Sequence, residues 1–191
     1  ALALLRNFQP REIWTGLMPP DEPAWREVEK LAHGRGIRLR QPRAGEQWTF
    51  GGVRFQAWAP FPGDEPGPEA HNNDSLVFTV AHGRHRFLLT GDAEALVERR
   101  MLDFGLSGPV QVLKVGHHGS RTSTSAAFLD ALQPALAVIS CGRQNGFRHP
   151  NARILDRLKE HGSQIVRTDT GGLVTIRSDG RYLLTEGFHS F

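Results

Sequence analysis

Two adjacent histidines stand out in the stretch LKVGHHGSRTSTS, residues 113–125, directly after a short apolar run. Imidazole nitrogen is a common ligand of borderline divalent metals such as zinc and manganese. Adjacent side chains diverge, so we expect only one of His117 and His118 to bind a given metal. The other would donate a proton or contact a substrate. A solvated polar turn that holds two exposed imidazoles is the alternative.

The residues around this pair favour the functional interpretation. Gly116 and Gly119 flank the histidines and would allow the backbone to approach a ligand closely. Ser120 and Arg121 follow, and their side chains could donate hydrogen bonds to a phosphate. The hydroxyl-rich chain beyond them, at Ser123 or Thr124, could also cap the next helix.

Other candidate groups also lie next to apolar strand-like runs, where a rigid sheet presents functional groups. Asp92 follows the run RFLLTG, and His149 follows ALAVIS after a loop. Asp92 is either a metal-binding carboxylate or the N-cap of the following helix. His149 is either part of the same site or a plain helix-entry residue, which Pro150 biases to an extended conformation.

The asparagines near these runs and the remaining histidines fit structural roles better. Asn145 and the pair Asn72–Asn73 suit turns, and would matter for chemistry only if they face the same pocket. We expect five histidines to be structural or solvated, because they lie in a hairpin turn, near helix ends or near the C-terminus: His33, His82, His85, His161 and His189.

The length and composition are typical of one globular domain. The chain has 191 residues and a formal net charge of +3, a mild excess that allows an anionic substrate without requiring one. The single cysteine, Cys141, excludes an internal disulfide. No apolar run reaches the roughly 20 residues that span a bilayer, and no signal peptide is visible.

The hydrophobic pattern predicts a mixed α/β fold built from hairpins and strand–helix–strand units. Asp21 and Gly34 would bound one helix, and Asn151 and Gly162 another. A Pro- and Gly-rich surface loop is expected at residues 60–74. The expected helices are 1–8, 23–34, 95–104, 125–133 and 151–161, and the expected strands are 11–16, 37–40, 47–50, 53–58, 75–81, 86–91, 110–115, 135–140, 164–168, 173–177 and 181–185.

Three segments taken together carry a family resemblance. They are NNDSLVFTVAHGRHRFLLTGDAE, VLKVGHHGSRTSTSAAFLDALQPALAVIS and CGRQNGFRHPN, within residues 70–155. This combination resembles the metallo-β-lactamase-like domain of the ComEC competence, or DNA-internalisation, proteins. The resemblance extends weakly upstream through LLRNFQPREIWTG. It implies an α/β fold of the metallo-β-lactamase-like αββα sandwich type, with a dinuclear metal site at one edge.

The resemblance also implies roles for individual residues. Asp92 would bridge a pair of divalent metals, manganese or zinc, and His117 would be the tandem histidine at the metal site. His118 and His149 would be catalytic residues. Asn73, Ser120, Arg121 and Asn145 would bind substrate, and the ligand that relatives place near Asn73 could be replaced or supplied by His71.

One feature departs from the family pattern. Metallo-β-lactamase folds carry an early HxHxDH-type segment that provides most of the metal ligands, whereas the sequence before His71 has only His33. We therefore expect residues 1–191 to form a single domain that lacks its N-terminal part. The donors present would make half a site with weak affinity for metal.

In the family, the implied activity is metal-dependent phosphodiester hydrolysis. The domain would be a soluble part of a bacterial inner-membrane protein, facing the periplasm or cell exterior. Its partners would be single-stranded DNA and the membrane-embedded part of the parent protein. The domain would degrade the DNA strand that is not transported. No small-molecule cofactor is expected. Two alternatives remain open: a hydrolase of RNA or of a small ester on the same fold, and a metal-free scaffold or DNA-binding module.

Overall fold

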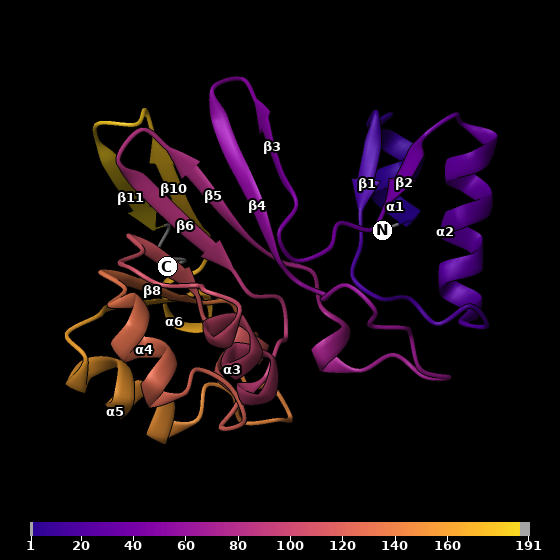
Figure 1. Cartoon of the computed structure of the whole chain (residues 1–191). Helices are drawn as coiled ribbons and strands as arrows, with labels where there is room; N and C mark the ends of the chain where they lie inside the picture. Colours follow the sequence, from indigo (N-terminus) through magenta and orange to yellow (C-terminus); the bar gives the residue numbers. More distant parts are fainter. Residues whose placement is uncertain (1, 188–191) are drawn as a thin grey trace.

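A seven-stranded mixed sheet organises the chain, which a computed structural model describes over residues 2–187. The strand order follows the sequence from β3 to β9, with antiparallel pairing from β3 to β6 and parallel pairing from β6 to β9 (Figure 1). The strands are β3 (Gln47–Phe50), β4 (Val53–Ala59), β5 (Val77–His82), β6 (His85–Leu89), β7 (Val112–Lys114), β8 (Leu136–Ile139) and β9 (Gln164–Arg167).

Three helices pack against this sheet and enclose the main core. They are α3 (Ala95–Asp103), α4 (Ala126–Leu132) and α5 (Ala152–Glu160). Met101, Phe128 and Ile154 from these helices are almost fully buried together with Leu88 and Leu113 of the sheet. Burial of such side chains stabilises the fold by about 1.5–3 kcal/mol each. The carboxyl ends of β6, β7 and β8 are thereby held rigidly against one another.

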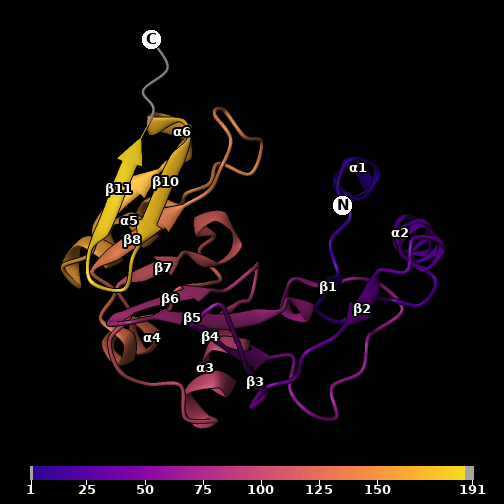
Figure 2. The same ribbon diagram turned by 90° about the horizontal axis from the view of Figure 1, so that it is seen from above.

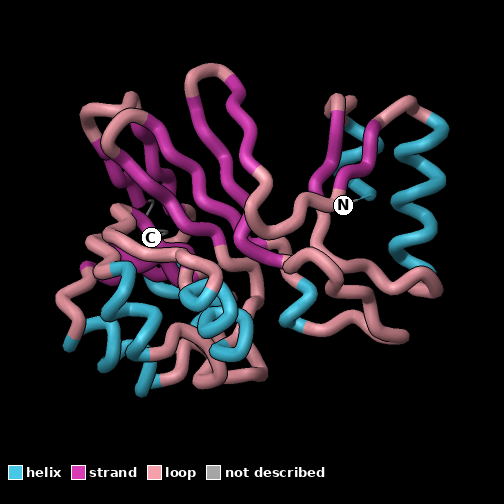
Figure 3. The backbone as a smooth tube through the Cα atoms, in the orientation of Figure 1, coloured by secondary structure: helices cyan, strands magenta, loops and turns pink. Residues whose placement is uncertain are grey.

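The N-terminal residues form a separate small unit beside the sheet. It contains α1 (Leu2–Asn7), β1 (Glu12–Trp14), α2 (Pro23–Gly34) and β2 (Arg38–Arg40), and β1 pairs parallel with β2. Figure 3 shows this unit standing apart from the C-terminal strands. The Trp14 ring meets Trp48 edge-on, with centroids 4.6 Å apart, and also contacts Phe55 and Phe78. These aromatic contacts join the unit to β3, β4 and β5.

A C-terminal hairpin lies on the sheet face opposite α3 and α4 (Figure 2). It consists of β10 (Val174–Ser178) and β11 (Leu183–Gly187), and the short helix α6 (Thr168–Gly171) precedes it. His82 Nδ1 lies 3.2 Å from the Ser178 carbonyl oxygen, and His85 Nδ1 lies 2.7 Å from the Ser178 hydroxyl. These two histidines therefore hold the hairpin, as expected of structural residues, whereas His189 lies outside the described residues.

The expected elements are confirmed, but some of their caps differ and one short helix was not expected. The helix at residues 23–34 has Glu22 at its N-cap, and Asp21 instead pairs with Arg26, so the prediction of Asp21 as the cap was wrong. Ser125 caps α4 by accepting from the Phe128 amide, which corrects the choice of Ser123 or Thr124. Asn151 caps α5 as predicted. The hydrophobic pattern does not predict α6, because a single helical turn leaves little periodic signal.

The tandem histidines lie in a short 3-10 turn, η2 (Gly116–Gly119), between β7 and α4. A Cβ on Gly116 would lie 2.8 Å from the Ala93 carbonyl oxygen. A Cβ on Gly119 would lie 2.6 Å from the Pro150 Cβ. Gly119 also has φ +84°, a left-handed backbone that favours glycine. Both glycines therefore allow close approach of neighbouring loops of the chain.

None of the helices in residues 2–187 combines the length and the apolar character needed to cross a bilayer.

Replacing Gly119 by alanine should destabilise the domain by more than about 1 kcal/mol, because the new methyl group meets Pro150 and the left-handed backbone disfavours alanine. Urea denaturation measures the change. Gly34→Ala is the matched control: it has open space around it and an ordinary φ, so it should not be destabilised and should gain up to about 1 kcal/mol. Equal stability of the two variants would contradict this packing.

Candidate functional site

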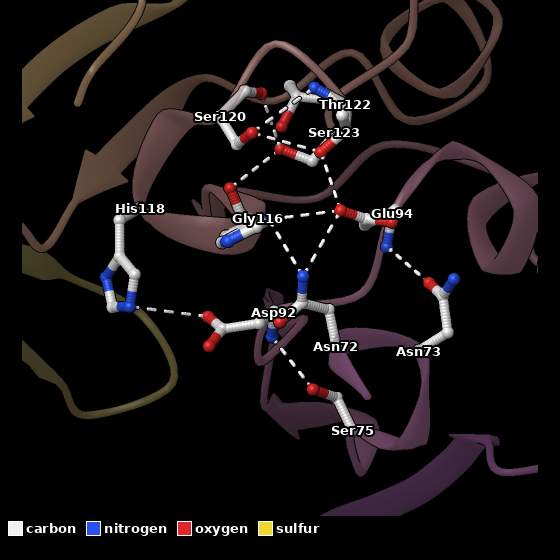
Figure 4. Close-up of polar contacts among 12 residues, drawn as sticks. Asn72, Asn73, Ser75, Asp92, Glu94, Gly116, His118, Ser120, Thr122 and Ser123 are labelled. Carbon is white, nitrogen blue, oxygen red and sulfur yellow. Dashed lines mark hydrogen bonds and ion pairs between the residues drawn. The ribbon is translucent and has the colours of Figure 1, made fainter. Parts of the chain in front are cut away.

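Polar side chains from three adjacent parallel strands converge at one edge of the sheet. Asp92 follows β6, the histidine pair follows β7, and His149 lies in the loop after β8. Because these strands are neighbours and parallel, their carboxyl ends meet at the same edge, the usual place for ligands in α/β sheets. Figure 4 shows His118 facing the Asp92 carboxylate, with Asn72, Ser75 and Glu94 nearby.

His118 faces Asp92 through its Nε2 atom. Its Nδ1–H donates to the Ser140 carbonyl oxygen over 2.6 Å, and Nε2 lies 3.5 Å from Asp92 Oδ1. A carbonyl can only accept, so Nδ1 carries the proton and Nε2 presents its lone pair to the carboxylate. Two lone pairs that face each other repel. The arrangement is therefore suited to a cation, or to a water molecule that donates to both atoms.

His117 forms a second pair, with Glu94. His117 Nδ1 lies 3.2 Å from Glu94 Oε1. The Thr122 hydroxyl donates to the same oxygen over 2.7 Å, and Asn72 Nδ2 donates over 3.3 Å. These hydrogen bonds, that of Thr122 above all, hold the pKa of Glu94 below its ordinary value. An anionic carboxylate therefore lies behind His117.

The two histidines point apart because both have a left-handed backbone. His117 has φ +44° and ψ +47°, and His118 has φ +55° and ψ +21°. Consecutive non-glycine residues in this region cost roughly 1–3 kcal/mol each. Such strain clusters at functional sites, where the surrounding structure enforces it. The expected divergence of the pair is thus observed, with one ring toward Asp92 and the other toward Glu94.

His149 completes a row of rings. Its ring centroid lies 5.5 Å from that of His117 and 5.9 Å from that of Phe147. Burial, followed by the nearby His117 and His118, lowers the pKa of His149, while Asp92 opposes the shift. A neutral imidazole can accept or relay a proton near pH 7, as expected of an acid–base residue.

The side chains of Ser75 and Lys114 lie next to Asp92 and position it. Its backbone N–H donates to the Ser75 hydroxyl over 2.9 Å. Lys114 Nζ donates to the Gly91 carbonyl oxygen over 2.6 Å and lies 3.9 Å from Asp92 Oδ1. Burial lowers the pKa of Lys114, and the Asp92 carboxylate acts in the opposite direction. The N-cap of α3 is Glu94, so the cap interpretation of Asp92 was wrong.

The buried carboxylate of Glu98 clamps the loop after the histidines. Glu98, only 1% exposed, accepts from the backbone N–H groups of Thr124 and Ser125, the latter over 2.8 Å. Arg157 donates to the Thr124 carbonyl oxygen over 2.7 Å. Burial raises the pKa of Glu98 in spite of these bonds. The carboxylate thus provides acceptors for two loop N–H groups that the neighbouring backbone carbonyls do not pair with.

The four predicted substrate-binding residues do not share one environment. Asn73 accepts from the Glu94 amide over 3.0 Å, and Ser120 is buried, with its hydroxyl 3.0 Å from that of Thr122. Asn145 bonds within its own loop. Arg121 alone is exposed near the histidines. Substrate contact by the four stays a prediction. The first three already use side-chain hydrogen bonds to shape the site.

Sequence reasoning overlooked Glu94, Glu98 and Lys114. Each left a signal. Lys114 interrupts an apolar strand, and Glu98 lies between Val97 and Met101 on the buried face of α3. A charge within an apolar pattern is costly unless it has a partner, so it marks a structural clamp or a site. His71, considered as a further ligand, instead caps the short turn η1 (Asn72–Asp74).

The donors do not fit a complete metal site. Among residues 2–187, no three His, Cys, Asp or Glu side chains come together so as to hold an ion. Protein metal sites usually need three or four such ligands. Asp92 with His118, and Glu94 with His117, are two pairs with suitable chemistry, yet each is short of that number. His117 as the ligand partner of Asp92 also finds no direct support, because His118 is the histidine that faces Asp92.

Comparisons with known proteins agree with this architecture. Residues 59–143 match the model of the metallo-beta-lactamase superfamily. The crystal structure of CmlA, a diiron beta-hydroxylase from Streptomyces venezuelae, superimposes with a TM-score of 0.53 over 82% of this chain and 38% of that chain. At 11% identity, this likeness shows the fold alone.

Three relatives share more of the sequence. The chain is 33% identical to ComE operon protein 3 of Bacillus subtilis, over 84% of this chain and 20% of that protein. It is 38% identical to Recombination protein 2 of Haemophilus influenzae, over 70% and 16% of the two chains. It is 35% identical to Competence protein ComA of Neisseria gonorrhoeae, over 76% and 22%. The chain thus spans about a fifth of the length of these relatives.

The matched segment and the sheet with its helices confirm the predicted fold class: the chain contains a metallo-β-lactamase domain. Within that superfamily it is the domain of the ComEC-family competence proteins, as the sequence resemblance predicted.

Replacing Glu98 by glutamine should destabilise the domain by about 1–3 kcal/mol, because the new amide N–H₂ faces a backbone N–H that then has no acceptor. Denaturant unfolding measures the loss. Glu160→Gln, exposed at the end of α5, is the control and should change stability by less than about 0.5 kcal/mol. A stability equal to that of the parent would show that Glu98 does not hold the loop.

Proposed function

We propose that this domain is the phosphodiester hydrolase module of a DNA-uptake protein, and that it degrades the DNA strand that is not transported. The observation that carries the proposal is that the lone pairs of His118 Nε2 and Asp92 Oδ1 face each other, 3.5 Å apart, at the carboxyl edge of the sheet. Such a pair is suited to a divalent cation. Its place in a domain related to competence proteins supports a nucleic-acid substrate.

The 191 residues provide part of the proposed site. The superfamily suggests a pair of divalent metals, manganese or zinc, yet the described donors form two pairs and no triad. We propose that a segment outside these residues supplies the remaining ligands, and that residues 1–191 are one incomplete metallo-β-lactamase domain. Metals in such a site would supply Lewis acidity and a reactive hydroxide. Asp92 as the bridging carboxylate stays a prediction.

The chain's own residues have defined tasks in this proposal. Ser140 fixes the tautomer of His118, so the Nε2 lone pair faces Asp92 and would bind a cation together with it. His149, whose lowered pKa favours the neutral ring, relays a proton to or from the substrate oxygen. Arg121 and Arg148 are exposed beside the site and would bind flanking phosphates.

The setting of the domain is also part of the proposal. The relatives are about five times longer than the matched segment. We propose that the parent is a bacterial inner-membrane protein whose membrane-embedded part passes single-stranded DNA inward. The domain would then face the periplasm or the cell exterior, where the discarded strand remains.

A metal-free scaffold or DNA-binding module is the second candidate function. The observation that favours it is the lack of a three-donor cluster in residues 2–187. In this case the site would bind phosphate without cleaving it.

Replacing Asp92 by alanine in the complete domain of the parent protein should lower the rate of manganese-dependent cleavage of linear single-stranded DNA by at least about 100-fold. The reason is that a carboxylate central to the site is lost. Gel electrophoresis of an end-labelled strand measures the rate. Asp156→Ala, an exposed aspartate on α5, is the control and should cleave normally.

Undiminished cleavage by Asp92→Ala would refute the role of Asp92. No cleavage by the parent, with metal shown to be bound, would move the assignment to RNA or a small ester. No cleavage and no bound metal would favour the scaffold.

A further inference from the structure

A cavity of about 310 Å³ adjoins the Asp92–His118 pair on the side of the loop after β8. Its volume is at the lower end of ligand pockets, which range over roughly 300–1,000 Å³. His118 belongs to both places, because its ring lines the cavity while its Nε2 faces Asp92. A ligand in the cavity therefore lies beside the proposed phosphate position. The lining residues are His118, Ser140, Cys141, Gly142, Asn145, Phe147 and His149.

One wall of the cavity is a pair of stacked rings. Phe147 lies over His149 with an interplanar angle of 18° and a centroid distance of 5.9 Å. Phe147 is nevertheless 83% exposed, so most of its ring is open to solvent. Packing therefore does not explain a large apolar ring at this position. Isolated exposed rings are common, but this one borders a cavity at a candidate site.

The loop that carries Phe147 is fixed before any ligand binds. Asn145 Nδ2 donates to the carbonyl oxygens of Gly142 over 2.9 Å and His149 over 2.7 Å. Its Oδ1 accepts from the His149 amide over 2.9 Å. These three bonds close the loop on itself and fix the backbone that carries both rings. Ordering the loop in advance reduces the entropy lost on binding.

Resting on the proposed function, we propose that this cavity is a subsite for one unpaired nucleobase, which stacks on Phe147 while its neighbouring phosphate lies at the Asp92–His118 pair. Every base has an aromatic face, so stacking on phenylalanine and histidine accepts any sequence. In a duplex both faces of a base are covered by its neighbours. The subsite therefore selects single-stranded nucleic acid, and the exposed Arg148 next to Phe147 favours the phosphate backbone.

The test measures binding to the 191-residue chain in EDTA, so that cleavage plays no part. Fluorescence anisotropy compares a short fluorescein-labelled single strand with a strand of equal length and charge whose sugars lack bases. The base-bearing strand should bind about 5- to 100-fold more tightly, the range expected for one stacked base. Phe147→Ala and Phe147→Leu should lose this preference, because neither has an aromatic face, whereas Phe147→Trp should keep it.

Phe50→Ala is the matched control, since Phe50 is 76% exposed at the end of β3 and away from the cavity. It should bind as the parent chain does. A 2-aminopurine in the strand should be quenched on binding by the parent chain and by Phe50→Ala, and not by Phe147→Ala. A duplex of the same sequence should show no preference that depends on Phe147.

Equal binding of the two strands, an unchanged preference in Phe147→Ala, or no binding of either strand would each overturn the nucleobase subsite. The first two results leave the hydrolase proposal intact, since DNA still binds and cleavage depends on Asp92. Conversely, base-dependent binding with no cleavage by the complete domain would retain the subsite and refute the nuclease.

Discussion

The hydrogen bond from His118 Nδ1–H to the Ser140 carbonyl oxygen is the interaction on which the site depends. At 2.6 Å it ties the turn after β7 to the end of β8. It also fixes where the single proton of a neutral imidazole resides, and so turns Nε2 toward Asp92 as a lone-pair donor. A backbone carbonyl partner for the second ring nitrogen is a common feature of metal-binding histidines. The rest of the site is arranged around this fixed ring.

Several features that are unfavourable in free energy maintain that arrangement. Two consecutive histidines adopt left-handed backbone, Lys114 is partly buried next to Asp92, and Glu98 is buried behind the loop. Each would be unfavourable alone, and each is compensated by specific hydrogen bonds. The large apolar core beneath α3, α4 and α5 supplies the stability that makes these local costs tolerable.

Much of this fold could be predicted from sequence because the pattern is local. Alternating and continuous apolar runs predicted the strands of the sheet, and Gly51–Gly52 predicted the hairpin of β3 and β4. The convergence of Asp92, His118 and His149 followed from strand ends that precede them. The pairing of each histidine with its carboxylate could not be predicted from sequence. Which histidine faces Asp92 depends on the positive φ angles of His117 and His118. Glu98 was missed for a similar reason, since its partners are backbone N–H groups 26 and 27 residues away.

The central claim is that Asp92 and His118 form part of a divalent-metal site, which donors beyond the described residues complete. Calorimetric titration of manganese or zinc into the complete domain, with and without Asp92→Ala, tests this directly. The account predicts a pair of bound ions in the parent domain and at least about a tenfold loss of affinity in the variant, as expected when a metal site is disturbed. Metal binding that is unchanged in Asp92→Ala, or no binding by the parent domain, would contradict it.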